Sequence, residues 1–409
     1  MDRRDFLWGM GVAGGIAALP FERAAWAEGA PAGTPELAMT ESRKAYGELV
    51  DMLKELDARY LGPERGITRP QDIFDGHRYI LHQLASAFDL VGEGDPERPR
   101  FQKIVTPTRK FGGDNPDAIY YSTLIRPDRS YRVRGNIAGA TYTSISWEVG
   151  SADGHYPTGV ARAINDTELK PDAQGNYELL LGPNPMPGNW FKLDPHVGSL
   201  TTRHYFETPT CIELDRLKTI PLTIEALDKP GPSPAPTDES VAAGIRRVIN
   251  WVRGWTIDQA PMMQPGKVPN WVSTVPNKFN RPALPSGGIG FANRDAAYAE
   301  APFLVGPDQA LVIEGRFPEC RFANVMLWNR YIQSFDYLTH RISLNRKQMQ
   351  FQPDGSFKLA VAHKDPGIPN WLDASGRTYG LVYWRIVLPE GEIEPFKSTL
   401  MPLAEVAKH

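Results

Sequence analysis

The sequence predicts an α+β fold that is mostly β, with accessory helices near the N-terminus and in the middle of the chain. Short runs rich in β-branched and aromatic residues recur about every ten residues, and turn residues separate them. Glycine and proline number 37 each and are spread along the chain, which suits many turns between short strands. Helical spacing of apolar residues is confined to a few stretches. This pattern favours layers of a β-sandwich or a barrel over a helical bundle.

Composition narrows the class of protein. The chain has 409 residues, enough for two domains, and its 41% hydrophobic and 23% charged residues are typical of a soluble globular protein. The 45 basic and 48 acidic residues nearly cancel, and no basic block is present, so nucleic acid is not an expected partner. No segment of the mature chain approaches the length of a transmembrane helix, so we expect no integral membrane span.

The N-terminus reads as an export signal. Residues 2–7 (Asp-Arg-Arg-Asp-Phe-Leu) resemble the twin-arginine motif, and residues 8–20 form a short, glycine-rich apolar run. Residues 25–27 (Ala-Trp-Ala) then offer an A-x-A cleavage site. We expect residues 1–27 to be a signal peptide cleaved after Ala27, and the mature protein to be periplasmic or secreted. The route carries cofactor-containing and cofactor-free proteins alike, so it implies no cofactor.

Residues 28–110 are expected to be a helical region. Residues 41–60 and 70–90 each carry apolar residues at helical spacing, which predicts two helices with one buried face each. His77 and His82 lie five positions apart, a spacing that does not place them on one helix face. Partly buried histidines are therefore expected here, and not metal ligands.

Residues 111–230 are expected to form a β-rich domain. Residues 111–117 are a turn cluster of glycine, aspartate, asparagine and proline, and β-branched and aromatic runs follow it. The expected strands are 118–125, 131–133, 141–149, 159–164, 177–181, 200–206 and 211–214.

Residues 231–300 are expected to hold a helix and an irregular linker or lid. Thr237 can cap a helix whose first turn carries Asp238 and Glu239, where acidic groups suit the helix dipole. Residues 259–290 contain several prolines and are long for a loop, so we expect them to cover a groove or act as a lid.

Residues 301–409 are expected to form a second β-rich domain. The turn at 353–355 (Pro-Asp-Gly) lies between two strand-like runs and predicts a hairpin. The expected strands are 310–315, 323–331, 348–351, 357–363 and 379–388.

Cofactor and thiol chemistry receive little support from the sequence. Cys211 and Cys320 lie far apart, and they are either a disulfide of an exported protein or two buried thiols. No GxGxxG unit, P-loop, GxSxG elbow or CxxC pair is present. We therefore expect no bound cofactor and recognise no metal-ligand spacing.

Several segments resemble the domain of unknown function 1214 family. The downstream segments are 311–318, 329–331, 353–357 and 365–372, and the upstream ones, similar to longer members, are 115–117, 120–121, 188–190 and 203–206. The resemblance implies β-sandwich or jelly-roll-like layers with accessory helices. It implies no established reaction, so no catalytic residues are carried over.

The loop at 362–373, rich in proline and carrying His, Asp, Asn and Trp, is the expected site. His363 and Asp365 are two positions apart at a strand end, so both side chains can face one cavity, as general acid or base and its orienting partner. The alternative is a surface histidine beside a turn-forming aspartate. Arg316 completes the expected catalytic set as a clamp on an anionic group, and a structural salt bridge with Glu314 is its alternative.

The same loop supplies expected substrate-binding residues. The Trp371 indole can form a pocket wall and the Asn370 amide can fix polar groups of a ligand; the alternative is that both only shape the turn. The further substrate-binding residues that we expect are Glu314, Asp117, Tyr120 and Arg385.

These observations predict an exported enzyme that acts on a small organic molecule by side-chain acid–base chemistry, of hydrolase or lyase type. Ten tryptophans and fifteen tyrosines make an aromatic-lined pocket an expected feature. The alternative is a non-catalytic periplasmic binding protein for a carbohydrate, lipid or protein partner, since β-sandwiches serve both purposes.

Overall fold

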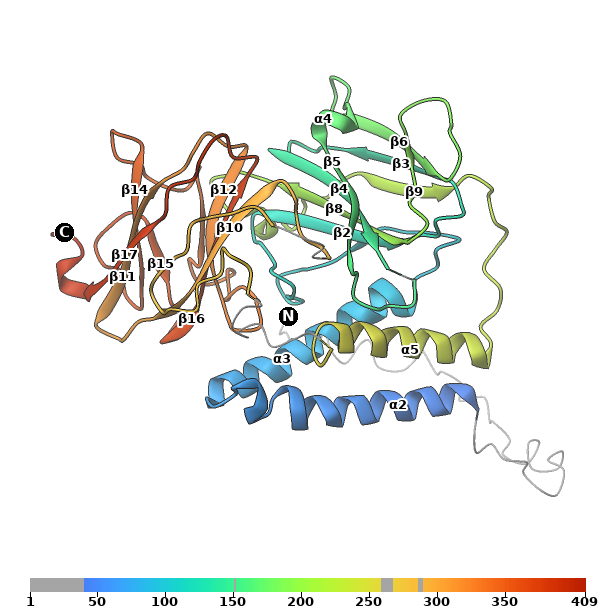
Figure 1. The fold of residues 1–409 in the computed structure, drawn as a ribbon, viewed down its shortest axis with the longest axis horizontal. Helices are drawn as coiled ribbons and strands as arrows, with labels where there is room; N and C mark the ends of the chain where they lie inside the picture. The colour runs from blue at the N-terminus through green and yellow to red at the C-terminus, as the bar shows by residue number, and fades with distance from the viewer. Residues whose placement is uncertain (1–39, 151, 259–267, 286–289) are drawn as a thin grey trace, which may run out of the picture.

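The computed structural model describes residues 40–150, 152–258, 268–285 and 290–409. Two β-rich parts lie side by side above a layer of helices (Figure 1). The prediction of a mostly β, α+β fold with accessory helices is therefore confirmed. The expected export signal at 1–27 lies outside the described residues, as does the segment up to residue 39.

The N-terminal β-sandwich consists of two mainly antiparallel sheets. The first has the order β1 (Gln102–Lys103), β2 (Ala118–Leu124), β8 (Val197–Tyr205), β4 (Tyr142–Val149), β5 (Gly159–Asn165). The second has the order β7 (Trp190–Lys192), β6 (Asn176–Gly182), β3 (Tyr131–Asn136), β9 (Leu222–Ala226). Inward-facing residues of both sheets form one core, in which the Trp147 and Phe191 rings lie 5.8 Å apart. This is the alternating sandwich packing that the strand spacing predicts.

The C-terminal β-sandwich repeats this plan. Its first sheet has the order β10 (Ala296–Leu304), β16 (Tyr379–Val387), β12 (Phe322–Trp328), β13 (Ser343–Asn345). Its second sheet has the order β15 (Trp371–Asp373), β14 (Ser356–Ala362), β11 (Gln309–Arg316), β17 (Lys397–Pro402). Between the two sheets, the Phe357 and Trp384 rings stack with centroids 5.2 Å apart.

The helical layer consists mainly of α2 (Glu41–Glu55), α3 (Pro70–Ala87) and α5 (Asp238–Gly254), and α4 (Asp166–Leu169) is a single turn elsewhere. Short helical turns extend α2 to Tyr60 and α3 to Gly92, so the predicted helices at 41–60 and 70–90 are confirmed. The predicted cap is also confirmed, because the Thr237 side chain accepts a hydrogen bond from the Ser240 backbone N–H in a capping box.

The two sandwiches face each other across a buried layer. The β2-β8-β4 face that points away from its own core meets the outer face of β10-β16-β12, and the Tyr205 and Phe322 rings lie 5.1 Å apart there. Both sheets are thus covered on both faces. This explains why β12 is buried at every position and carries no polar alternation.

Two strand predictions are wrong. Residues 211–214 were expected as a strand, but Ile212–Leu214 form one helical turn, and Ile212 reaches a small core with Phe206 from that turn. Residues 348–351 were expected to pair with β14 through a hairpin at 353–355. Instead, β14 pairs with β11 and β15.

The side chain of Asn370 explains the second error. Its amide oxygen accepts from the Gln350 N–H at 2.8 Å, and its amide nitrogen donates to the Gln350 carbonyl at 2.7 Å. This amide therefore satisfies backbone groups that a neighbouring strand would otherwise satisfy. The first half of the expected hairpin, residues 348–351, therefore does not pair as a strand.

The linker region also contains a strand that was not expected. β10 begins at Ala296 within 231–300 and runs on to Leu304, across the expected boundary. The described part of the irregular segment runs along β10 through bridges of Val272 with Glu300 and of Ala283 with Tyr298. Residues 259–267 and 286–289 of this segment lie outside the described residues. The lid role stays a prediction.

Gly380 in β16 lies at a tightly packed point of the C-terminal core. A Cβ atom there would lie 2.6 Å from Phe303 Cε1 and 2.8 Å from both Phe335 Cζ and the Trp328 carbonyl oxygen. We expect Gly380→Ala to lower the free energy of unfolding by roughly 1–3 kcal/mol through overpacking. Gly47→Ala is the matched control, because no atom lies within 4 Å of that added methyl group on α2. In urea unfolding, the midpoint of Gly380→Ala should fall and that of Gly47→Ala should rise. Equal midpoints for the two variants would contradict tight packing at Gly380.

Candidate functional site

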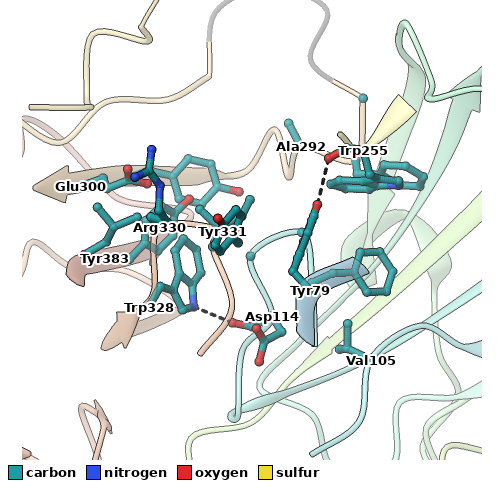
Figure 2. A pocket seen from close by; sticks show the side chains of 18 of the residues that line it. Tyr79, Val105, Asp114, Trp255, Ala292, Glu300, Trp328, Arg330, Tyr331 and Tyr383 are labelled. Atoms are coloured by element: carbon teal, nitrogen blue, oxygen red, sulfur yellow. Dashed lines mark hydrogen bonds between the residues drawn. The ribbon is translucent and has the colours of Figure 1, made fainter. Parts of the chain in front are cut away.

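A cavity of about 550 Å³ lies where the two sandwiches and the helical layer meet (Figure 2). Its volume falls in the usual range for small-molecule sites. Aromatic side chains from all three parts are prominent in its wall: Tyr60, Tyr79, Phe111, Tyr120, Tyr156, Tyr205, Trp251, Trp255, Trp271, Phe291, Tyr298, Trp328, Tyr331, Tyr379 and Tyr383. The charged residues that line it are Arg65, Asp114, Arg203, Glu300, Arg330 and Arg385. We call this the central cavity.

One wall of the central cavity is a block of four side chains on β10 and β16. In the antiparallel register, Glu300 lies opposite Tyr383 and Tyr298 lies opposite Arg385. Residues two apart on a strand point to the same face, so these four side chains share the cavity face of the sheet. Diagonal neighbours in such a pair have Cβ atoms about 7–8 Å apart, which sets the separation of Glu300 and Arg385.

Glu300 is a buried acid without a partner. Its residue is 5% exposed, and its backbone is held by bonds to Trp271 and Ser273. No side chain or backbone group of the described residues hydrogen-bonds or ion-pairs with its carboxyl group. Burial raises the pKa of this carboxyl to about 7. A carboxyl group that changes protonation near neutral pH, inside a cavity, is a candidate acid or base.

The other acid on the wall, Asp114, is fully engaged. Its carboxylate accepts from the Ser334 N–H at 2.8 Å and from the Ser334 hydroxyl. Its carbonyl accepts from the Trp328 indole N–H at 3.0 Å, as the dashed line in Figure 2 shows. Nearby, Lys110 donates to the Phe335 carbonyl at 2.7 Å, and burial lowers the pKa of its ammonium to about 8. These bonds fasten residues 110–114 to the C-terminal sandwich.

The opposite wall is aromatic and comes from the helical layer. The Tyr79 hydroxyl donates to the Trp255 carbonyl at 3.0 Å, which holds α3 against the end of α5. The Trp255 ring stacks on Phe291, with centroids 5.6 Å apart. In Figure 2, Tyr79 and Trp255 lie across from Glu300. The central cavity can therefore hold an apolar or ring-shaped ligand against flat side chains on one side and acid–base groups on the other.

Two of the residues expected from sequence line the central cavity. They are Tyr120 on β2 and Arg385 on β16. Asp117 lies just outside it, between the sandwiches, and its carboxylate accepts from Asn324 at 2.9 Å and Asn345 at 3.0 Å. Burial raises the pKa of Asp117 to about 6. Its contacts join the two sandwiches.

The expected catalytic residues lie elsewhere, on the outer sheet of the C-terminal sandwich, and none of them lines the central cavity. His363 Nε2 lies 3.0 Å from the Val305 carbonyl oxygen. Asp365 is exposed and accepts from the Gly367 N–H at 2.8 Å, as a turn residue does. Arg316 pairs with exposed Asp354 at 3.1 Å. The expectation that these residues join Tyr120 and Arg385 in one pocket is not met, and their catalytic role stays a prediction.

The other expected residues, Trp371, Asn370 and Glu314, lie on or beside the outer sheet. The Trp371 indole donates to the Ala362 carbonyl at 3.1 Å and packs on a small core with Val406. Asn370 bonds backbone groups, as described above, so both residues match the structural alternative for the loop. Glu314 lies in register with Lys358 of β14 and Lys397 of β17, and the alternative salt bridge with Arg316 is not formed, because Arg316 pairs with Asp354.

The part of the chain that the structure describes contains neither a candidate metal site nor a disulfide. No group of three or more His, Cys, Asp or Glu side chains there could hold a metal ion. Cys211 lies beside the Ser343 hydroxyl and Cys320 beside Arg346, and both are free thiols. Among the described helices, none has the length and apolar character needed to cross a bilayer.

Sequence reasoning did not single out Glu300. β10 is rich in alanine and lacks the β-branched residues by which strands are recognised. One signal was present: Glu300 is the sole charged residue within the apolar run Ala296–Leu304. A lone acid in a run that is otherwise buried is the kind of exception that marks a functional position.

Comparison with known proteins finds a similar fold but indicates no activity. No family model and no curated protein matches the chain. An uncharacterized protein from Burkholderia cenocepacia has a similar structure, with a TM-score of 0.74 and 25% identity over 89% of this chain and 98% of its own. A protein from Vibrio parahaemolyticus covers 79% of this chain and 98% of its own, at a TM-score of 0.47 and 10% identity. The resemblance to the domain of unknown function 1214 family stays a prediction.

The raised pKa of Glu300 predicts a pH-dependent stability. Below its ordinary pKa of 4.5 the carboxyl is protonated in both states; between 4.5 and about 7 the unfolded chain loses the proton that the folded chain keeps. Stability should therefore fall as the pH rises through this window, by up to about 3 kcal/mol. Glu300→Gln should remove this loss, so the variant should gain on the native protein between pH 4.5 and 7. Urea unfolding across that range measures the gap. The exposed Glu225→Gln is the control, and a constant gap for Glu300→Gln would contradict the shift.

Proposed function

We propose that this chain is an enzyme that transforms a small organic molecule by acid–base chemistry in the central cavity, with Glu300 as the proton-transferring group. The observation that carries the proposal is the partnerless Glu300 carboxyl, whose pKa lies near 7 inside an aromatic-walled cavity. A general acid or base works best when its pKa lies near the working pH. The reaction class expected from the sequence, hydrolase or lyase, is kept, but the proposed chemistry is moved to Glu300.

Two reactions fit one carboxyl group. In an elimination, the Glu300 carboxylate takes a proton from carbon, the C–H electron pair forms the new double bond, and the leaving group departs with its own pair. In a hydrolysis, the carboxylate takes a proton from the water whose oxygen bonds to the substrate carbon; the bond to the leaving group breaks, and the leaving group keeps that electron pair and receives the proton from Glu300. Each needs a group that is partly ionised at neutral pH and partly protonated for the return of the proton, and a pKa near 7 supplies both forms.

Tyr383 is placed to assist. It lies directly opposite Glu300 in the strand register, on the same cavity face. Burial holds the pKa of its phenol well above the ordinary value of 10, so the hydroxyl stays protonated at neutral pH. A neutral phenol can donate a hydrogen bond to an oxygen on which negative charge develops during the reaction.

The second candidate is a non-catalytic binding protein, and the continuous aromatic wall favours it, because stacked rings hold a ligand without chemistry. Export and membership of the domain of unknown function 1214 family remain separate proposals, motivated by the twin-arginine-like residues 2–7 and by segments such as 365–372. The assignment of chemistry to Glu300 depends on neither.

Turnover measurements distinguish the candidates. The purified chain is incubated with panels of small esters, lactones and hydroxy acids, and products are followed by mass spectrometry. For a substrate so found, Glu300→Gln should lower kcat by roughly 10²–10⁴. Glu225→Gln, an exposed acid on β9, is the matched control and should keep full activity.

His363→Ala provides the competing test. It should keep turnover if the central cavity is the active site, because His363 lies outside it. Loss of turnover in His363→Ala with full activity in Glu300→Gln would move the site back to the loop at 362–373. If a compound binds tightly and no compound is turned over, the binding-protein alternative is favoured. Circular dichroism checks that every variant is folded.

A further inference from the structure

Arg385 is a buried cation with donors to spare. The residue is 4% exposed, and its Nη2 donates a long hydrogen bond of 3.3 Å to the Gly113 carbonyl. Its Nε and Nη1 atoms are buried and have no hydrogen-bond partner among the described residues. No carboxylate of the described residues lies within 4 Å of its guanidinium group. A buried charge without hydrogen-bond partners costs free energy. A bound anion at this position would remove that cost.

The other arginines of the central cavity are occupied. Arg330 pairs with Asp72 at 3.0 Å and also donates to two backbone carbonyls. Arg203 lies 3.7 Å from buried Glu148, donates to the Phe291 carbonyl at 2.8 Å and bonds the Ser146 hydroxyl. Arg65 donates to the Ile257 carbonyl at 2.7 Å. Among the described arginines that line the cavity, Arg385 is thus the one with buried N–H groups that lack an acceptor.

Aromatic rings surround Arg385 without taking up its N–H groups. Its Cζ atom lies 5.2 Å from the Tyr383 ring centroid and 5.8 Å from those of Tyr205 and Tyr298. Rings at such distances stabilise a cation through their π faces without using its N–H groups. The guanidinium is therefore held in position while its buried Nε–H and Nη1–H groups lack an acceptor among the described residues.

We propose that the central cavity recognises a small organic carboxylate, whose carboxylate group binds Arg385 while its apolar body lies among the aromatic side chains. This inference rests on the proposed function for the reaction at Glu300, but the binding step stands by itself. A planar carboxylate accepts two N–H groups from a guanidinium at once, and one unmatched cation suits one negative charge.

Geometry limits the size of the ligand. Glu300 and Arg385 are diagonal neighbours across β10 and β16, with Cβ atoms about 7–8 Å apart. A carboxylate on Arg385 thus places atoms two or three bonds away within reach of the Glu300 carboxyl. The flat wall formed by Trp255 and Phe291 lies across the cavity and suits a ring or a short unsaturated chain.

Paired acids and amides test the inference. Benzoate, phenylacetate, cinnamate and hexanoate are titrated into the full chain by calorimetry, each beside the amide of the same acid. At least one carboxylate should bind ten-fold or more tightly than its amide, and this preference should disappear in Arg385→Gln. Arg134→Gln on β3, an exposed arginine outside the cavity, is the matched control and should keep the preference.

A second variant covers loss of folding. Arg385→Lys keeps a cation among the tyrosine rings but loses the planar pair of donors, so the preference should fall several-fold while the chain stays folded. Equal binding of every acid and its amide by the native chain would overturn the inference. An undiminished preference in either Arg385 variant would overturn it as well.

Glu300→Gln separates this inference from the proposed function, because the variant should bind carboxylates and fail to transform them. Should an Arg385-dependent preference be found while Glu300→Gln keeps full turnover, the reaction assignment fails and the binding inference stands. Should Glu300→Gln lose turnover while acids and amides bind alike, the reaction assignment stands and the binding inference fails.

Discussion

The structure depends on one constraint: two β-sheets, β2-β8-β4 and β10-β16-β12, are each covered on both faces. A strand in such a position has no solvent-facing side, so each polar side chain on it needs a partner or an exceptional reason. Most have partners. Arg203 lies beside Glu148, and Asp117 lies against Asn324 and Asn345. Glu300 and Arg385 depart from this pattern, and both departures open into the same cavity.

The helical layer turns this buried seam into a cavity. In Figure 1, α3 lies under the middle of the molecule and α5 lies under the N-terminal sandwich. Trp255, which follows the end of α5, lines the central cavity. Arg330 reaches from the C-terminal sandwich to Asp72 on α3, which ties the layer to the sheets. The aromatic wall and the charged wall therefore belong to different parts of the chain, held together by such bonds.

Local pattern predicts the elements well and the site poorly, for physical reasons. The helices at 41–60 and 70–90 are visible because one apolar face repeats every turn, and most strands are visible by their β-branched residues. β10 was not recognised, since alanine packs well between covered sheets but has no strand preference. The loop at 362–373 attracted the site prediction because it concentrates His, Asp, Asn and Trp. Its Asn370 and Trp371 bond backbone carbonyls instead, and sequence cannot distinguish these two uses of one side chain.

The pairing of β10 with β16 has a consequence for how the protein comes into being. These strands are joined across the whole of β11 to β15, so forming their ladder costs the entropy of closing the long chain segment between them. Glu300 and Arg385 meet through that long-range closure, and Tyr79 on the facing wall comes from α3, much earlier in the chain. A chain cut between its sandwiches would keep Glu300 and Arg385 on one piece but would expose the tyrosine-bearing face of β10 and β16 to water. Completion of the C-terminal sandwich therefore brings the two residues together, and the N-terminal sandwich encloses them.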